Sequence, residues 1–536
     1  MGRLKQLVYR SAPYRWLLQP RGTVTLSVPL SVAWPGNPTR GRGIAQGEIT
    51  LGGRSVPLAG PGWPDADVPS SAWLAELDGF DWLADLRELG GDPGRRGARE
   101  LVNRFLDAHG VWHPLAWRAD VLGRRIAAWL GYYDFFAASA EDEFKDRLAL
   151  ALTRQLRHLA RVADDARPGA ASISACRGLI LGALALAGER RHLKPALDRL
   201  ASALRAQVLT DGGHASRSPQ VHLRVVADLI DIRQALRTAQ QPIPEALTSA
   251  IEAMAAMLRY LRYADGTLAL FNGANEGEIG FLETVIAQSE SRPRLAVAAP
   301  DMGFQRLAAG RTVLLVDAAG PVALEGRAHA GTLAFELSIA RERLVVNLGG
   351  AGHHEIEWQA AQRSTAAHST LTIDDTNSSA IAPDGSLGRA PDEVTVNREE
   401  TDGQVWLDAS HNGYAERFAV IHRRRLYLSA DGEDVRGEDV LTGAGSHQFA
   451  IRFHLHPKVQ VSLAQNGVAA LLRLPSGLGF RLRAQGGRLS LGDSVYLGQV
   501  GEMRRSRHVA ITGVCANGNA QVKWAIRRDS KKDAPA

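Results

Sequence analysis

The sequence predicts a chain in two parts, an array of helices followed by an antiparallel β-sandwich. Between about residue 73 and residue 263, apolar residues recur at helical spacing. After about residue 303, short β-type runs alternate with Gly, Asp and Asn. A helical first part and a strand-rich second part predict a multidomain α+β protein.

Two apolar stripes carry the helical prediction. Their members recur every three or four residues, so each stripe covers one face of an amphipathic helix. The first comprises Leu122, Ile126, Trp129, Leu130 and Tyr133, and the second comprises Phe144, Leu148, Leu152, Leu156 and Leu159. Further helices are predicted near residues 96–109, 174–187, 195–208, 220–238 and 245–263, which favours an α/α array.

The strand prediction is clearest around residues 333–338, where apolar side chains alternate with Ala, Glu and Ser. This alternation predicts a strand with one apolar face, and residues 344–347 are its expected hairpin partner. His329 precedes this strand, and His368 precedes a third predicted strand at residues 370–373. Two histidines at the ends of neighbouring strands can converge, as a metal site or an acid/base pair requires. The alternative is that both histidines are structural.

The composition is that of an ordinary globular protein, with 45% apolar and 22% charged residues in a chain of 536. The formal net charge of +6 makes a polyanionic partner reasonable, whether acidic polysaccharide, nucleic acid or anionic lipid. A nucleic-acid partner is not expected, because there is no basic stripe with interleaved aromatic residues. Cys176 and Cys515 fall in different predicted domains and are expected to be small buried hydrophobes.

No transmembrane segment and no secretory signal are predicted. The longest apolar run, residues 178–188, is well short of the roughly 20 residues that span a bilayer. Residues 1–22 carry positive charge and some Leu, but no continuous apolar region and no small-residue cleavage site.

Four blocks of the sequence resemble the heparinase II/III family, in the expected order. They are WHPLAWRADVLGRRIAAWLGYYDFF at 112–136, LTDGGHASRSPQVH at 209–222, H-A-x-x-L-x-F-E-L-S from His329, and RSTAAHST at 363–370. The resemblance implies an incomplete α/α toroid followed by a β-sandwich. The expected boundaries are an irregular arm at 1–70, the toroid at 71–295, the sandwich at 300–528 and a disordered tail at 529–536.

The resemblance also implies β-elimination on a uronate-containing polysaccharide, with a Tyr and a His as acid and base. In this chain the Tyr position is Val221, and a valine can neither donate nor accept a proton. His214, His222 and His329 are therefore the catalytic candidates, and a tyrosine from elsewhere in the chain is the alternative. In the sandwich, Arg327 stands at the position of the family's catalytic histidine.

Arginine and amide groups suit the carboxylates of such a substrate. The predicted substrate-binding residues are His113, Arg124, Arg125, Arg217, Asn272, Asn275 and Glu276. For Arg124 and Arg125 the alternative is a solvated helix face.

His329, Asn347 and His368 match the family's metal-ligand positions, which implies one structural, zinc-like divalent ion and no organic cofactor. Asn347 stands where a carboxylate is expected and is a poorer zinc ligand. Gly331 likewise replaces an Asp of the family pattern.

The predicted function is therefore that of a polysaccharide lyase acting on an acidic, uronate-containing polymer. The alternative is a catalytically inactive acidic-glycan-binding protein of the cell envelope, which Val221, Arg327 and Gly331 favour. The resemblance implies the cell envelope or periplasm. Because no signal peptide is recognised, the cytoplasm is the alternative location.

Overall fold

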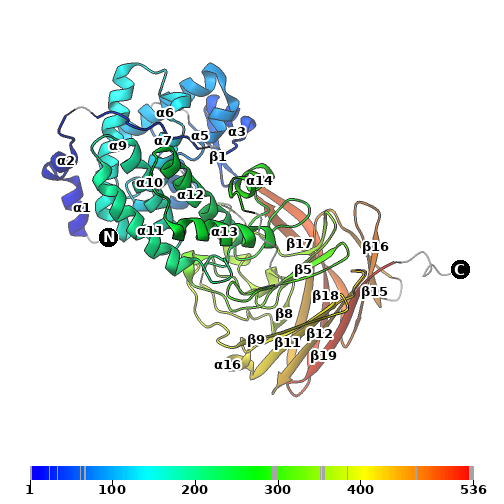
Figure 1. Cartoon of the computed structure of the whole chain (residues 1–536). Helices are drawn as coiled ribbons and strands as arrows, with labels where there is room; N and C mark the ends of the chain where they lie inside the picture. The colour runs from blue at the N-terminus through cyan, green and yellow to red at the C-terminus, as the bar shows by residue number, and fades with distance from the viewer. Residues whose placement is uncertain are drawn as a thin grey trace. The chain divides into compact units, whose positions relative to one another are not determined.

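The computed structural model describes residues 3–22, 24–32, 34–58, 60, 62–64, 68–291, 298–350, 352, 356–382, 384–464 and 467–529. The chain forms two compact units, a helical unit and a sheet unit (Figure 1). The helical unit comprises Met1–Val208, Leu223–Ala255 and Glu283–Ser291, and the sheet unit comprises Leu209–His222, Ala256–Leu282 and Arg292–Ala536. Within the described ranges, no helix is long and apolar enough to cross a membrane. The predicted domain junction at 292–297 and the predicted tail beyond Asp529 lie outside the described residues.

Helices dominate the chain up to residue 291. They are α1 (Arg3–Arg10), α2 (Ala12–Leu18), α3 (Pro38–Ala45), α4 (Ser71–Gly79), α5 (Leu83–Leu89), α6 (Gly91–His109), α7 (Ala119–Gly131), α8 (Tyr133–Phe136), α9 (Asp142–Val162), α10 (Ala170–Ala185), α11 (Leu193–Gln207), α12 (Pro219–Thr238), α13 (Glu245–Tyr260) and α14 (Ile279–Gln288). The hairpin β1 (Glu48–Leu51) and β2 (Arg54–Pro57) interrupts them. The predicted helical region is thus confirmed.

Residues 1–70 are more regular than the irregular arm expected from their Gly and Pro content. The described residues of this segment form three helices and one hairpin. Ser11 begins α2 by accepting a hydrogen bond from the Tyr14 amide at 3.3 Å, and Asn37 begins α3 by accepting one from the Thr39 amide at 2.9 Å. These side-chain caps satisfy amide groups that a helix start leaves free, and the prolines in each first turn suit a helix start because no N–H is needed there.

The core of the helical unit follows the two predicted stripes. Leu122, Ile126 and Trp129 of α7 are fully buried, as are Leu148, Leu152, Leu156 and Leu159 on α9, whereas Phe144 is partly buried. Helices α7 and α10 approach so closely that a β-carbon on Gly178 would lie 2.4 Å from the Gly123 α-carbon. Facing glycines therefore set the distance between these two helices.

Strands dominate the chain after residue 298. They are β3 (Ala298–Ala299), β4 (Phe304–Ala309), β5 (Thr312–Asp317), β6 (Phe335–Ile339), β7 (Glu342–Val346), β8 (Leu371–Ile373), β9 (Val394–Thr401), β10 (Gln404–His411), β11 (Val420–Leu428), β12 (Asp434–Gly443), β13 (His447–Leu455), β14 (Gln460–Leu463), β15 (Ala469–Arg473), β16 (Gly479–Gln485), β17 (Arg488–Gln499), β18 (Glu502–Cys515) and β19 (Ala520–Arg528). The short helices α15 (Ile356–Ala361) and α16 (Ala415–Phe418) lie between strands.

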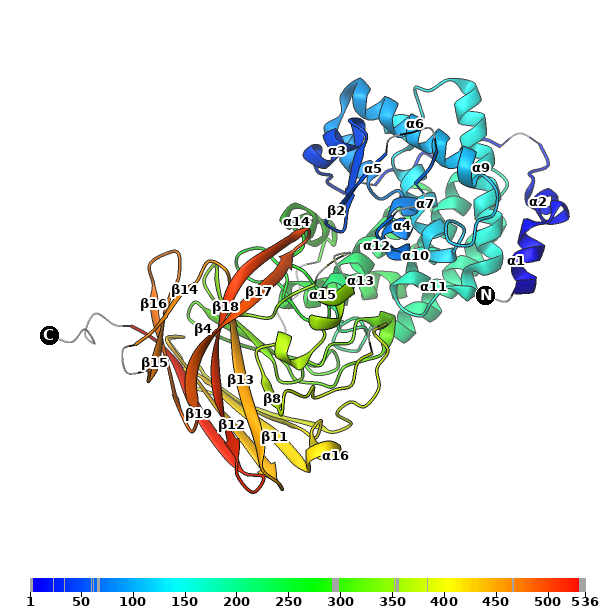
Figure 2. The same ribbon diagram turned by 180° about the vertical axis from the view of Figure 1, so that it is seen from behind.

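These strands form two antiparallel sheets that enclose one apolar core (Figure 2). One sheet has the order β14-β15-β16-β19-β12-β11-β10-β9, and the other has the order β17-β18-β13-β7-β6-β5-β4-β3, with β8 paired to β13. Phe335 of one sheet stacks on Trp524 of the other, with ring centroids 5.6 Å apart. The predicted antiparallel sandwich is confirmed.

Strand β6 differs from the prediction in being buried on both faces. Glu336 and Ser338, expected on a polar face, are as buried as Phe335 and Leu337. The loop that follows α13 covers this second face, because the Leu270 amide donates to Glu336 Oε2 at 3.1 Å. Alternation along one strand cannot reveal a covering loop that comes from elsewhere in the chain.

Candidate functional site

The loop from Leu209 to His222 in the sheet unit holds the first two catalytic candidates. His214 is fully buried, and its Nδ1 accepts a hydrogen bond from the Ser216 amide at 3.1 Å. Burial, together with the charge of nearby His222, lowers the pKa of His214 to about 3. His222 is also fully buried and lies in the first turn of α12. The two predicted proton-transfer histidines therefore lie close together, and His214 is neutral at pH 7.

Arg217 from the same loop is engaged inside the protein. It adopts a left-handed backbone conformation with φ of 56°, and its Nε donates to the Met302 carbonyl at 2.7 Å. Its guanidinium also forms a buried ion pair with Asp317. Because its charge is already paired and its side chain is 4% exposed, Arg217 is a structural residue here rather than the expected ligand for a substrate carboxylate.

The loop at 271–277 holds the next three predicted residues, each fixed by a different contact. Asn272 is buried with φ of 49°, and its Nδ2 donates to the Arg217 carbonyl at 2.9 Å. Asn275 Oδ1 accepts from the Gly277 amide at 2.9 Å and so forms a turn. Glu276 accepts hydrogen bonds from the Tyr496 hydroxyl at 2.5 Å and from Gln499 Nε2 at 3.0 Å. All three side chains have partners within the sheet unit.

His329 and His368 converge, as the sequence predicts. His329 Nδ1 lies 3.2 Å from His368 Nε2, and His368 Nδ1 lies 2.7 Å from the Ser364 carbonyl. A carbonyl can only accept, so His368 carries its proton on Nδ1, and its Nε2 accepts the proton of His329 Nδ1. Burial lowers the pKa of His368 to about 4. It also lowers the pKa of His329, which the charges of His368, Arg363 and Arg327 lower further.

The predicted metal site of His329, Asn347 and His368 stays a prediction. Asn347 Oδ1 already accepts a hydrogen bond from the Ser369 amide at 3.0 Å, and Asn347 Nδ2 is buried without a hydrogen-bond partner. An amide NH₂ group cannot bind a cation, and the third ligand of a structural zinc site is normally a thiolate, imidazole or carboxylate. Across the described ranges, no three His, Cys, Asp or Glu side chains are grouped so that they could hold a metal. In this structure, His329 and His368 form a hydrogen-bonded pair.

The remaining predicted residues belong to the helical unit. Arg125 is fully buried, and it donates to Gln155 Oε1 at 2.9 Å and to the Asp78 carbonyl at 2.8 Å. Burial lowers the pKa of Arg125 to about 9. Arg124 is paired with Asp81 at 2.7 Å. Arg125 is thus a core residue, which corrects both the substrate role and the solvated-face alternative.

His113 also takes part in local structure. Its Nδ1 accepts a hydrogen bond from the Ala116 amide at 3.2 Å, and its ring centroid lies 4.5 Å from that of His109. This arrangement fixes the turn before α7.

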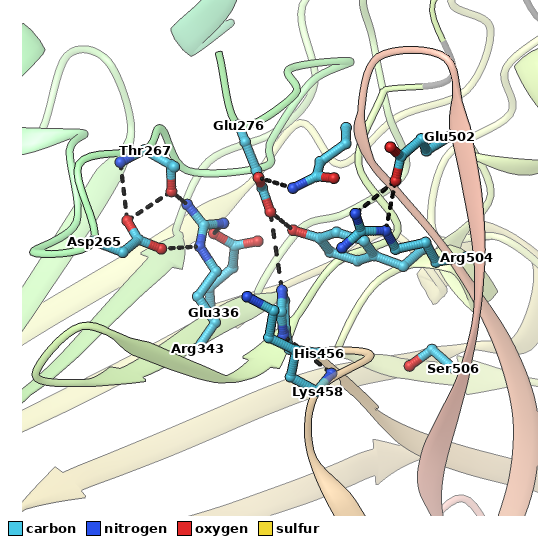
Figure 3. A network of polar contacts seen from close by, with 12 residues as sticks. Asp265, Thr267, Glu276, Glu336, Arg343, His456, Lys458, Glu502, Arg504 and Ser506 are labelled. Carbon is cyan, nitrogen blue, oxygen red and sulfur yellow. Dashed lines mark hydrogen bonds and ion pairs between the residues drawn. The ribbon is translucent and has the colours of Figure 1, made fainter. Parts of the chain in front are cut away.

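Sequence reasoning missed a polar network in the sheet unit (Figure 3). Arg343 pairs with Asp265 at 2.9 Å and lies 4.0 Å from Glu336. His456 lies 3.9 Å from Glu276, and burial lowers the pKa of His456 to about 4. Two of its members carried a sequence signal, Glu276 as a predicted substrate-binding residue and Glu336 as a carboxylate between Phe335 and Leu337.

Comparisons with known proteins agree with this architecture. The family described as "Heparinase II/III N-terminus" matches residues 107–290, and "Heparinase II/III-like, C-terminal" matches residues 291–525. FtsZ-localized protein C from Caulobacter vibrioides is 30% identical over 526 residues, covering 92% of this chain and 88% of that protein.

Among solved structures, the crystal structure of Heparinase III has a TM-score of 0.76 at 13% identity, covering 99% of this chain and 92% of that chain. A heparan sulfate lyase from Pedobacter heparinus has a TM-score of 0.61 at 14% identity, covering 92% of this chain and 84% of that chain. At these identities the structures show a shared fold. With matches in both of its parts, this chain belongs to the heparinase II/III family.

Proposed function

We propose that this protein is a non-catalytic member of the heparinase II/III family that binds an acidic glycan without cleaving it. The observation that carries the proposal is Val221. It stands where the family resemblance calls for a tyrosine that transfers protons, and it is buried on the first turn of α12. An aliphatic side chain cannot perform acid/base chemistry.

The neighbouring residues support loss of cleavage. Arg217, the expected carboxylate ligand, already forms an ion pair with Asp317. His329 and His368 satisfy one another in neutral form, and His214 accepts its hydrogen bonds from Ser216. Arg217, His214, His329 and His368 therefore each have a structural partner.

Binding is supported by the positive charge near His329. Arg327 Nη1 donates to the Gly273 carbonyl at 3.2 Å, and the charges of Arg327 and Arg363 both act on His329. Guanidinium groups suit carboxylates and sulfates, the anionic groups of acidic polysaccharides.

The name of the Caulobacter relative supports a location. That protein is called FtsZ-localized, and 30% identity over most of both chains supports extending this location to the present chain. We propose that it, too, localises with FtsZ. A fluorescent fusion imaged together with labelled FtsZ tests this location, and a protease-protection assay decides between the envelope or periplasm and the cytoplasm.

The test of activity is incubation with heparan, chondroitin, alginate and bacterial uronate polymers while ultraviolet absorbance of the unsaturated product is followed. We expect no new absorbance, and saturable binding to at least one polymer. Arg327→Ala and Arg363→Ala should each weaken that binding by about tenfold, the usual scale for a charged contact. The control Arg507→Ala, at an exposed position on β18, should leave it unchanged.

A lyase with a rearranged site is the second candidate, favoured by the closeness of His214 and His222. It requires new absorbance on one polymer and its loss in the double variant His214→Ala/His222→Ala. Absorbance in the wild type would overturn the non-catalytic proposal. Turnover that survives in the double variant would exclude these histidines as proton-transfer groups.

A further inference from the structure

Helices α1 and α2 expose an apolar face. Leu4, Leu7 and Val8 follow the i, i+3, i+4 spacing of one helix face, yet they are 76%, 67% and 50% exposed. On α2, Trp16 and Leu17 are 75% and 50% exposed. An amphipathic helix of a globular protein normally buries this face against the core, so five large exposed apolar side chains on two short adjacent helices require an explanation.

The opposite side of the two helices is already attached to the helical unit, beside α9 (Figures 1 and 2). The Tyr14 hydroxyl lies 2.6 Å from His158 Nδ1, and Leu18 is buried. The Tyr9 ring packs on Trp112 with centroids 5.7 Å apart. Tyr9, Tyr14 and Leu18 therefore attach the two helices to the helical unit. The exposed leucines and Trp16 face away from it.

The charged residues that the N-terminal segment itself contributes have one sign. Residues 1–47 contain seven Lys or Arg residues and no Asp or Glu. Within the two helices, Lys5, Arg10 and Arg15 are exposed. Lys5 also pairs with Asp165 at 3.1 Å, and the Arg10 guanidinium lies 5.6 Å from the Trp112 ring centroid. An apolar face bordered by basic side chains complements a surface that has an apolar interior and a negatively charged outer layer.

We propose that the α1–α2 face (Leu4, Leu7, Val8, Trp16 and Leu17) binds the surface of a membrane that contains anionic phospholipids. The leucines and Val8 enter the boundary between headgroups and acyl chains, as in other helices that lie in the interface plane. Tryptophan is favoured at this depth because its ring is apolar and its N–H is polar. The basic side chains remain among the phosphates, where the surface potential attracts them. This inference is independent of glycan binding, because it uses none of the residues of the sheet unit.

The experiment is flotation of the full chain with two kinds of vesicle, phosphatidylcholine alone and phosphatidylcholine mixed with phosphatidylglycerol. We expect the wild type to float with the mixed vesicles and to be released as salt rises, because salt screens the basic side chains. Leu4→Glu/Leu7→Glu should lower the partition by at least about tenfold, since it replaces two inserted leucines by charges. Both positions are exposed, so the fold should tolerate the change.

The control is Met503→Glu/Val514→Glu, which adds the same charge at two exposed apolar positions on β18 and should float like the wild type. Light scattering of the free proteins completes the test. Failure of the wild type to float with anionic vesicles, or equal flotation of Leu4→Glu/Leu7→Glu, would overturn the proposal. The proposal would also be overturned if the wild type were a dimer and Leu4→Glu/Leu7→Glu were a monomer, because the face would then bind a second copy of this chain.

Discussion

At the scale of single residues, Asp439 is the centre of a buried hydrogen-bond network in the sandwich. Its carboxylate accepts hydrogen bonds from His422 Nε2 at 2.7 Å, Arg424 Nε at 2.8 Å and Trp524 Nε1 at 2.9 Å. Arg424 lowers the pKa of Asp439 against the opposing effect of burial, so the carboxylate stays ionised. His422 is linked onward to His411, whose Nε2 lies 3.2 Å away. One buried charge therefore has three donors from two strands of one sheet.

We expect Asp439→Asn to lower the free energy of unfolding by about 3–5 kcal/mol, because it leaves the buried Arg424 charge without its counter-ion. Urea unfolding followed by circular dichroism measures the loss. The matched control is Asp408→Asn on the same sheet, where Asp408 pairs with the half-exposed Arg423 and Arg425. Loss of these exposed ion pairs should lower the free energy of unfolding by only about 0–1 kcal/mol. Equal losses in the two variants would contradict the role of Asp439.

At the scale of elements, the glycines between α7 and α10 set how closely the two helices pack. A β-carbon on Gly178 would lie 2.4 Å from Gly123, and one on Gly123 would lie 2.1 Å from the Ser174 carbonyl oxygen. Real β-carbons do not approach so closely, so the helices would have to separate. Because both helices are buried along most of their length, separation would also disturb their other neighbours.

Gly178→Ala is therefore expected to destabilise the helical unit by about 1–3 kcal/mol, the usual cost of overpacking, although alanine is the better helix former. Gly280→Ala in α14 provides the control, since a β-carbon there meets nothing within 4 Å. It should be neutral or raise the free energy of unfolding by about 0.5–1 kcal/mol. Thermal unfolding of both variants makes the comparison, and a Gly178→Ala variant as stable as the wild type would show that the helix pair can relax.

At the scale of the whole molecule, buried neutral histidines make stability depend on pH. Burial lowers the pKa to about 4 for His368 and His456, and to about 3 for His214 and His454. In the unfolded chain the pKa of each histidine returns to about 6.5, so each binds a proton at a higher pH than in the folded protein. The unfolded state then holds more protons than the folded state, so the stability present above pH 6.5 is lost as pH falls.

We expect the free energy of unfolding to decrease between pH 7 and pH 5, by up to about 1.4 kcal/mol per pH unit for each such histidine. Asp231 opposes this trend, because burial raises its pKa to about 7 and it holds a proton that the unfolded chain releases. Unfolding measured at several pH values gives the slope. His454→Asn should reduce the number of protons taken up on unfolding by at most one. A free energy of unfolding that is constant over this pH range would contradict the prediction.

The sequence by itself determined the order of the two parts, because helical periodicity and strand alternation are local properties that survive any packing. It also indicated that His329 and His368 could meet, since each precedes a predicted strand; these strands, β6 and β8, belong to one sheet without pairing with each other. It marked Val221 as a position without proton-transfer chemistry. The order of the parts rests on residue type and spacing, whereas the meaning of Val221 rests on the family resemblance.

Only the tertiary structure decided which polar side chains are available for chemistry. Arg217, Arg125 and Glu276 have the residue types of a substrate site, yet partners distant in sequence hold each of them. The same holds for α1, which lies in the part expected to be an irregular arm. Its Leu4, Leu7 and Val8 are exposed, while Tyr14 and Tyr9 attach the two helices to the helical unit. The physical reason is that burial and pairing depend on long-range contacts, which a local pattern does not contain.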